Sequence, residues 1–156
     1  MKKSLLAISL ISSFAFAEFD TKAVVGASAA KIDNENYTQY NVGYTSQTRF
    51  DNQIILGFGN TLSYGNVNKG KELIGLDMDL KAGYEVYKNL TAFAIGTGVV
   101  QSVDNNSSWG LGYGGALEYK LTSNVALEGS YKTINMNDSN GDYDYKTTNI
   151  GVKFNY

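Results

Sequence analysis

The chain has 156 residues, with 13 basic and 15 acidic side chains and a formal net charge of −2 at pH 7. It lacks cysteine, histidine and proline, and it is rich in glycine and tyrosine, with 17 and 12 residues. Without cysteine there is no disulfide framework and no thiolate metal site. Without histidine the commonest general base and metal ligand is missing. The acidic balance argues against a nucleic-acid partner, because such proteins present a basic surface.

The first 17 residues have the three parts of a cleaved secretory signal peptide. Lys2 and Lys3 form a basic start, an apolar stretch covers 5–16, and Ala15-Phe16-Ala17 is a small-x-small cleavage site. The apolar stretch is about a dozen residues, short of the roughly 20 that a spanning helix needs, which disfavours an uncleaved anchor. We therefore expect an exported chain, with a signal peptide at 1–17 and one domain at 18–156.

The rest of the chain predicts eight β-strands, because apolar and polar side chains alternate along it with a period of two. The strands are expected at 19–31, 37–46, 53–64, 74–85, 91–99, 109–121, 125–132 and 145–156. The alternation is sharpest in the fourth strand, where leucine and methionine alternate with Asp77, Asp79 and Lys81. In the first strand the two faces differ little.

The connections between these strands alternate in length. Long polar segments at 32–36, 65–72, 102–108 and 135–144 alternate with short turns near 49–52, 86–89 and 122–124. This layout predicts an antiparallel up-and-down meander with short periplasmic turns and longer extracellular loops. A chain without a spanning helix enters a membrane only as a closed barrel, so the fold class is all-β, an eight-stranded transmembrane β-barrel. Aromatic residues near strand ends predict two interfacial girdles: Tyr64 and Trp109 at the outer level, and Tyr84, Tyr119, Phe154 and Tyr156 at the inner.

The last strand carries the pattern of an assembly signal. Ile150, Val152, Phe154 and Tyr156 share one apolar face, and the strand finishes on an aromatic residue. This stretch resembles the C-terminal signal of bacterial outer-membrane β-barrels, although Tyr156 stands where that family more often has phenylalanine. With the strand count and the loop asymmetry, the whole exported chain resembles the small eight-stranded outer-membrane family of the OmpA transmembrane domain, OmpX and the opacity-type proteins. The resemblance implies a place in the bacterial outer membrane, contact with its lipid and lipopolysaccharide, and insertion by the barrel assembly machinery.

The polar faces of the strands place charged residues inside the expected barrel. An eight-stranded barrel is only wide enough to be filled by side chains, so these charges predict an ion-pair network that plugs the lumen, with room supplied by small residues on facing strands. The network comprises Asp77, Asp79, Lys81, Glu85, Glu118, Lys120, Glu128, Lys132 and Lys153, and the small residues are Ala92, Ala94, Gly96, Gly98, Gly110, Gly112 and Gly114.

Two contacts are predicted within this network. We expect Glu128 to pair with Lys153 across the last hairpin and with Lys120 across the sixth and seventh strands. The alternative register sets Glu118 opposite Glu128, and like charges in that position are unfavourable.

Three functions fit this pattern. The first is a monomeric structural or surface-interaction protein that meets a host or environmental ligand through loops 32–36, 65–72, 102–108 and 135–144. The second is a narrow gated channel for ions or small solutes, and the third is a soluble secreted ligand-binding barrel of the lipocalin type. We expect no enzyme, cofactor or metal site, because the paired carboxylates Asp77 and Asp79 have no histidine to work with. Lys31, Lys69 and Lys71 are candidate contacts for lipopolysaccharide phosphates.

Overall fold

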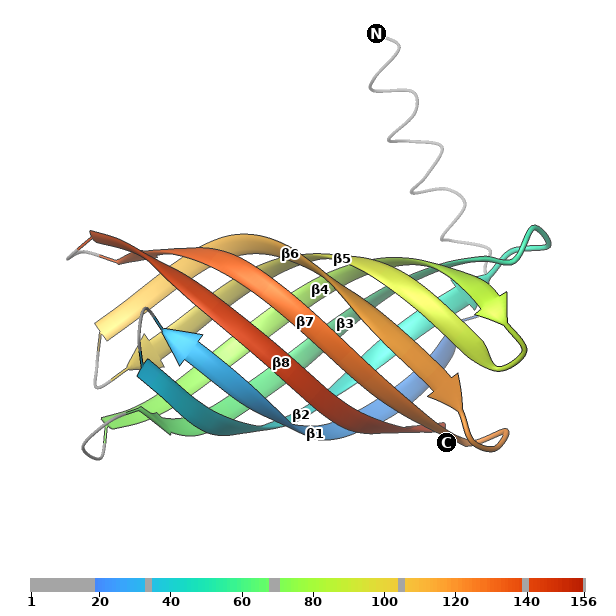
Figure 1. The fold of residues 1–156 in the computed structure, drawn as a ribbon, viewed down its shortest axis with the longest axis horizontal. Coiled ribbons are helices and arrows are strands. Elements are labelled where there is room, and N and C mark those ends of the chain that lie inside the picture. The colour runs from blue at the N-terminus through green and yellow to red at the C-terminus, as the bar shows by residue number, and fades with distance from the viewer. Residues whose placement is uncertain (1–18, 33–34, 68–70, 104–105, 139–140, 156) are drawn as a thin grey trace, which may run out of the picture.

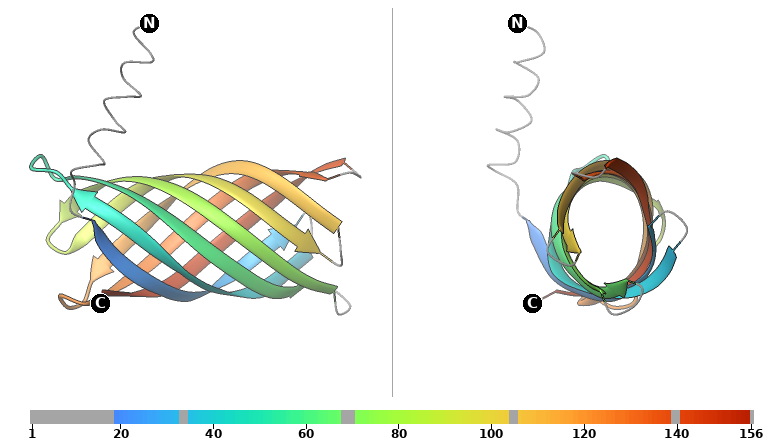
Figure 2. Two further views of the ribbon diagram at one scale, coloured as in Figure 1. Left: turned by 180° about the vertical axis from the view of Figure 1, so that it is seen from behind. Right: turned by 90° about the vertical axis from the view of Figure 1, so that its left-hand side faces the viewer.

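The computed structural model describes residues 19–32, 35–67, 71–103, 106–138 and 141–155, and it shows eight antiparallel strands closed into a barrel (Figure 1). Each strand pairs with its neighbours in sequence, and β1 pairs with β8 to close the ring seen end-on in Figure 2. The predicted fold is therefore confirmed. The strands are β1 (Asp20–Ile32), β2 (Glu35–Arg49), β3 (Ile54–Val67), β4 (Lys71–Tyr87), β5 (Leu90–Val103), β6 (Asn106–Lys120), β7 (Val125–Asp138) and β8 (Gly141–Asn155).

The strands run obliquely to the barrel axis. Following cross-strand partners once around the barrel from Lys22 of β1 leads back to Ile32 of the same strand, a stagger of ten residues. Such a stagger is the geometric consequence of closing a tilted sheet, and it brings residues far apart in sequence to the same level of the interior. Across the described ranges, no helix is long and apolar enough to cross a membrane.

The wall of the barrel has opposite polarity on its two faces. Large apolar side chains lie exposed on the outside, such as Leu80 at 71% and Ile150 at 66%, whereas charged side chains such as Lys153 are buried inside at 0%. Because successive residues of a strand point to opposite faces, this division follows directly from the period-two pattern of the sequence. Apolar residues that point inward, such as Leu73, are also fully buried.

The strands extend well beyond the predicted ends at one end of the barrel. We call this the outer end, where β1, β3, β5 and β7 finish, and the opposite end the inner end. The predicted long loops 32–36, 65–72, 102–108 and 135–144 are wrong as loops over most of their length, because strand pairing continues through them. In the last hairpin, for example, Asn137 pairs with Asp142. Strand pairing depends on backbone hydrogen bonds, which polar side chains do not prevent. The polar composition of these segments therefore does not show where the strands end.

Several predictions fall outside the described residues. The signal peptide at 1–17 and its cleavage site remain predictions, as does the role of Tyr156. Lys69 also lies outside the described ranges.

The inner-end connections are short, as the sequence predicts. Asn89 adopts a left-handed backbone with φ of 68°, and Gln53 does the same with φ of 66°. In the β6–β7 turn the hydroxyl of Thr122 accepts hydrogen bonds from the backbone N–H groups of Asn124 and Val125, at 3.2 and 3.1 Å. A side chain that caps the backbone in this way is a usual device of tight turns.

Candidate functional site

An apolar cluster fills the outer half of the lumen. It joins side chains from seven strands, which are Ala30, Tyr37, Val67, Leu73, Val99, Ile134, Met136 and Tyr145. Two hydrogen bonds lie at its margin: the hydroxyl of Tyr145 donates to Gln39 at 3.0 Å, and Gln101 donates to the hydroxyl of Tyr143 at 2.6 Å. The hydroxyl of Tyr37 and the Oε1 of Gln101 are buried without a hydrogen-bond partner among the described residues. The outer half of the lumen is thus a packed core. The sequence analysis placed no such cluster there, because most of these residues fell in predicted loops or on faces taken to be polar.

Buried charges fill the inner half. Seven of the nine predicted residues are at most 9% exposed: Asp77, Asp79, Lys81, Glu118, Glu128, Lys132 and Lys153. Lys22 of β1 joins them at 4% exposed, and the sequence analysis missed it because the faces of the first strand differ little. The buried set therefore contains four lysines and four carboxylates, which balances its charge.

Lys153 lies at the centre of the larger ion-pair group. Its ammonium donates to Glu118 at 2.7 Å and to Glu128 at 2.5 Å, so the predicted Glu128–Lys153 contact is present. Lys81 donates to Glu128 at 2.8 Å, and Lys22 donates to Glu118 at 3.1 Å. Each glutamate thus has two lysine partners, which is the pairing that buried charges require.

A smaller group lies nearer the outer end. Lys132 of β7 reaches across the lumen to β4, where it donates to Asp77 and, at 3.2 Å, to Asp79. The two aspartates, two residues apart on one strand, therefore serve as acceptors for one ammonium. This contact ties opposite walls of the barrel together, since β4 and β7 are not neighbours in the sheet.

The register of β6 and β7 differs from the prediction. Glu118 lies directly opposite Glu128, and Lys120 lies opposite Ala126, so the predicted Lys120–Glu128 pair is wrong. Cross-strand like charges alone disfavour this register. Here Lys153 bridges the two glutamates, and Lys22 and Lys81 add a cation on each side.

Glu85 and Lys120 do not belong to the buried network. Both are only half-buried at the inner rim, and Glu85 pairs with Arg49 at the end of β2. At this rim the carboxylate of Glu85 accepts a hydrogen bond from Arg49 and, at 3.2 Å, a second one from the backbone N–H of Asn89. The placement of these two residues within the plug is therefore wrong, because they lie too close to the strand ends to reach the packed interior.

The faces of β5 are the reverse of those predicted. Its large residues, including Phe93 and Ile95, are buried at 5% and 4%, and the small residues Ala92, Ala94, Gly96 and Gly98 line the outer face. Phe93 fits because Gly83 on β4 has no side chain: a Cβ there would collide with the ring. The ring lies 5.8 Å from the ammonium of Lys153, which is cation–π range.

Three of the four glycines of β6 do supply room inside the barrel, as the sequence predicts. Gly114, Gly112 and Gly110 face Lys132, Ile134 and Met136 on β7. A Cβ on Gly114 would lie 2.9 Å from the Cα of Lys132, and one on Gly110 would lie 2.6 Å from the Sδ of Met136. Bare backbone on β6 thus lets the long side chains of β7 enter the lumen.

The described part of the lumen contains a small polar cavity. A polar cavity of about 30 Å³ lies among Asn41, Ser63, Asp77, Asp79 and Lys132, room for one or two water molecules. With the apolar cluster above and the ion pairs below, the described interior contains packed side chains and not an open pore.

The predicted interfacial and assembly residues within the described ranges, which leave out Tyr156, face outward. Tyr64, Tyr84, Trp109, Tyr119 and Phe154 are each 44–56% exposed. Ile150 is 66% exposed on the outer face of β8, and Val152, half-buried, shares that face. Their roles at a membrane interface and in assembly remain predictions.

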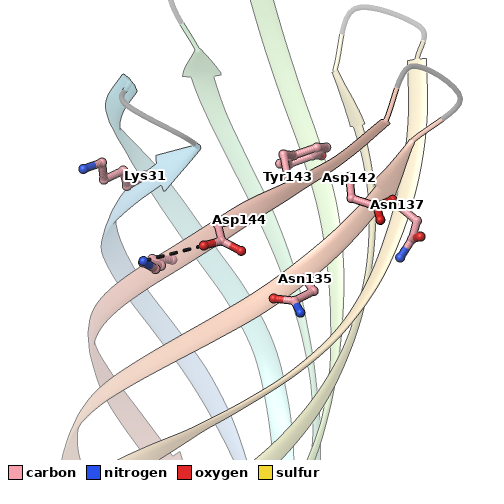
Figure 3. Close-up of a pocket in the computed structure, with 7 residues that line it drawn as sticks. Lys31, Asn135, Asn137, Asp142, Tyr143 and Asp144 are labelled. Atoms are coloured by element: carbon pink, nitrogen blue, oxygen red, sulfur yellow. Dashed lines mark ion pairs between the residues drawn. The ribbon is translucent and has the colours of Figure 1, made fainter.

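A broad hollow of about 640 Å³ lies at the outer end over β7, β8 and β1 (Figure 3). It is lined by Lys31, Asn135, Asn137, Asp142, Tyr143, Asp144 and Lys146. Part of the predicted ligand loop 135–144 therefore contributes to a surface, but it does so from paired strands. Its one described ion pair joins Lys146 to Asp144 at 3.8 Å and is drawn as a dashed line.

Comparisons with known proteins agree with this architecture. No family model matches the sequence, and no curated protein matches it. Three similar solved structures are small outer-membrane barrels. Neisserial surface protein A is 14% identical with a TM-score of 0.66, and the match covers 88% of this chain and 97% of that one. Ail, the attachment invasion locus protein of Yersinia pestis, is 12% identical with a TM-score of 0.62, and the match covers 87% of this chain and 97% of that one. The N-terminal β-barrel domain of Pseudomonas aeruginosa OprF is 16% identical with a TM-score of 0.50, and the match covers 89% of this chain and 100% of that one. At these identities the likeness establishes the fold, which is that of a small eight-stranded outer-membrane β-barrel.

Proposed function

We propose that this chain is an integral β-barrel protein of the bacterial outer membrane with a structural or surface-interaction role and no catalytic activity. It is exported by the signal peptide at 1–17, inserted as a monomer by the barrel assembly machinery, and surrounded by outer-membrane lipid and lipopolysaccharide. The observation that supports this proposal is the polarity of the barrel wall, which is the reverse of that of a soluble protein. Leucine, isoleucine and tyrosine side chains cover the outside, while eight charged side chains are buried within.

This polarity favours lipid as the surrounding medium. Soluble proteins rarely expose a continuous apolar patch larger than a few hundred Å², and here apolar residues are exposed on every strand of the barrel. A closed barrel also satisfies its backbone groups internally, which hydrocarbon requires. The soluble lipocalin-type alternative is disfavoured, because its ligand cavity would need an apolar and open interior.

The closed interior favours a structural or surface role over transport. The described part of the lumen is filled by the apolar cluster and the ion pairs, with a cavity of about 30 Å³ among them, and its buried charges are balanced. A surface role is also supported by the Yersinia pestis neighbour, which is named for attachment and invasion and has been solved with the heparin analogue sucrose octasulfate. In this chain the hollow over β7, β8 and β1 is the surface best placed to meet an external ligand.

Cell fractionation and bilayer recording test the proposal. We expect the full chain, expressed in a Gram-negative host, to sediment with the outer membrane and to migrate faster on gels before heating than after. We expect no single-channel steps from the purified protein in planar bilayers. Release into the periplasm or medium would contradict the proposed location, and discrete conductance steps would favour the gated-channel alternative.

A further inference from the structure

Two lysines lie directly opposite each other on the outer face, near the outer end. Lys31 of β1 pairs in register with Lys146 of β8, and the same row continues to Thr133 on β7 and Asn36 on β2. We call these four residues the lysine row. Lys31 and Lys146 both line the hollow of Figure 3. Every member of the row carries a hydrogen-bond donor, and none carries a negative charge.

This arrangement is unfavourable without an anion. Side chains directly opposite on antiparallel strands start about 5 Å apart, and like charges there repel. Lys31 forms no ion pair with the described residues, and Lys146 has only the long contact of 3.8 Å to Asp144. Both partners of that contact are about half exposed, at 45% and 62%, so it holds Lys146 weakly. Among the cross-strand pairs of the described strands, this is the only pair of lysines.

The surface changes from polar to apolar immediately below the lysine row. The next row toward the inner end contains Tyr131, Thr148 and Ala29, and the row after it contains Ile150 and Ala27. Tyr131 is 50% exposed and Ile150 is 66% exposed. An outward tyrosine between a charged row and an apolar surface is typical of the headgroup level of a membrane. The lysine row therefore lies where lipid phosphates lie.

We propose that the lysine row binds the phosphate group of an outer-leaflet lipid, whose acyl chains lie along Ala27 and Ile150. This assignment rests on the proposed outer-membrane location and adds a specific lipid site to it. The two ammoniums contact the phosphate together, which turns their repulsion into a shared attraction. The hydroxyl of Thr133 and the amide of Asn36 donate from the two sides, and Lys146 leaves Asp144 as it turns to the phosphate.

Native mass spectrometry of the refolded protein in detergent, titrated with diphosphoryl lipid A, tests this proposal. The wild type is expected to retain one lipid. In the double variant Lys31→Gln and Lys146→Gln, affinity should fall about thirtyfold, which is the contribution of two lysines at an anionic lipid surface. The matched control, Lys88→Gln with Lys120→Gln, removes the same charge from two positions at the inner end of the barrel and should keep the wild-type affinity. Asp144→Asn should bind more tightly, because it frees Lys146.

The remaining arms identify the source of the phosphate and guard against misfolding. Lipid A without phosphates should not be retained, and millimolar inorganic phosphate should not displace the bound lipid. Heat-modifiable gel mobility shows whether each variant is folded, and it reports on the barrel independently of lipid binding. Equal affinity in the wild type and the Lys31 and Lys146 variant, an equal loss in the control, or retention of the dephosphorylated lipid would each overturn the proposal. The proposed location would stand, because fractionation tests it separately.

Discussion

Replacing Lys153 with methionine is the sharpest perturbation of the buried network. Lys153 is 0% exposed and contacts both Glu118 and Glu128, which are directly opposite in register. Methionine nearly matches its length but removes the ammonium, so the two glutamates lose the cation that lies between them. Removing one partner of a buried ion pair costs roughly 3–5 kcal/mol. We expect a loss of that size, at its upper end because two carboxylates are affected.

Urea unfolding of the refolded barrel in lipid vesicles, followed by gel mobility and tryptophan fluorescence, measures this loss. Lys120→Met is the matched control, because it makes the same chemical change at a half-buried residue on the inner rim and should cost less than about 1 kcal/mol. Adding Glu128→Gln to Lys153→Met should recover part of the stability, since it removes one of the two facing charges. Equal losses for Lys153→Met and Lys120→Met, or no recovery in the double variant, would refute the role given to the network.

Three further predictions concern the interior packing and the closed lumen. Gly112→Ala should destabilise the barrel by about 1–3 kcal/mol, because its Cβ would press on Ile134. Gly96→Ala, with nothing within 4 Å of the new Cβ, should be neutral or slightly stabilising, and the same unfolding assay distinguishes the two. Tyr145→Phe removes the buried hydrogen bond to Gln39 and should cost about 1–2 kcal/mol by urea titration. Planar-bilayer recordings should stay silent for the wild type, and frequent discrete openings would show that the packed lumen conducts.

The strand count and most of the wall could be predicted from sequence because one face must meet an apolar medium. In β4 the alternation of apolar residues with Asp77, Asp79 and Lys81 leaves a single choice of face. In β5 both rows are apolar and differ only in size, so hydropathy could not orient the strand. The large row points inward, where Gly83 of β4 leaves the space that the ring of Phe93 fills and where Ile95 lies opposite Gly114 of β6.

Apart from the Glu128–Lys153 contact across the last hairpin, the pairing within the lumen could not be predicted from neighbouring strands. The cations around Glu118 and Glu128 come from β1, β4 and β8, as Lys22, Lys81 and Lys153. Only the closure of the barrel and its stagger bring them to one level, so a rule for isolated cross-strand pairs predicts the wrong register. The predicted loop lengths were wrong for a related reason. The sequence shows where side chains become polar, but it does not show where backbone pairing stops.

Labelling of the native protein from within the acyl-chain region of vesicles tests the orientation of the wall most directly. A carbene-generating probe dissolved among the lipid chains should modify outward residues such as Leu80, Leu111 and Ile150, as mapped by mass spectrometry of peptides. It should leave Leu73 and Lys153, both 0% exposed, unmodified. Modification of Leu73 and Lys153, with Leu80 and Ile150 protected, would show that the apolar rows face inward and would contradict the proposed membrane barrel.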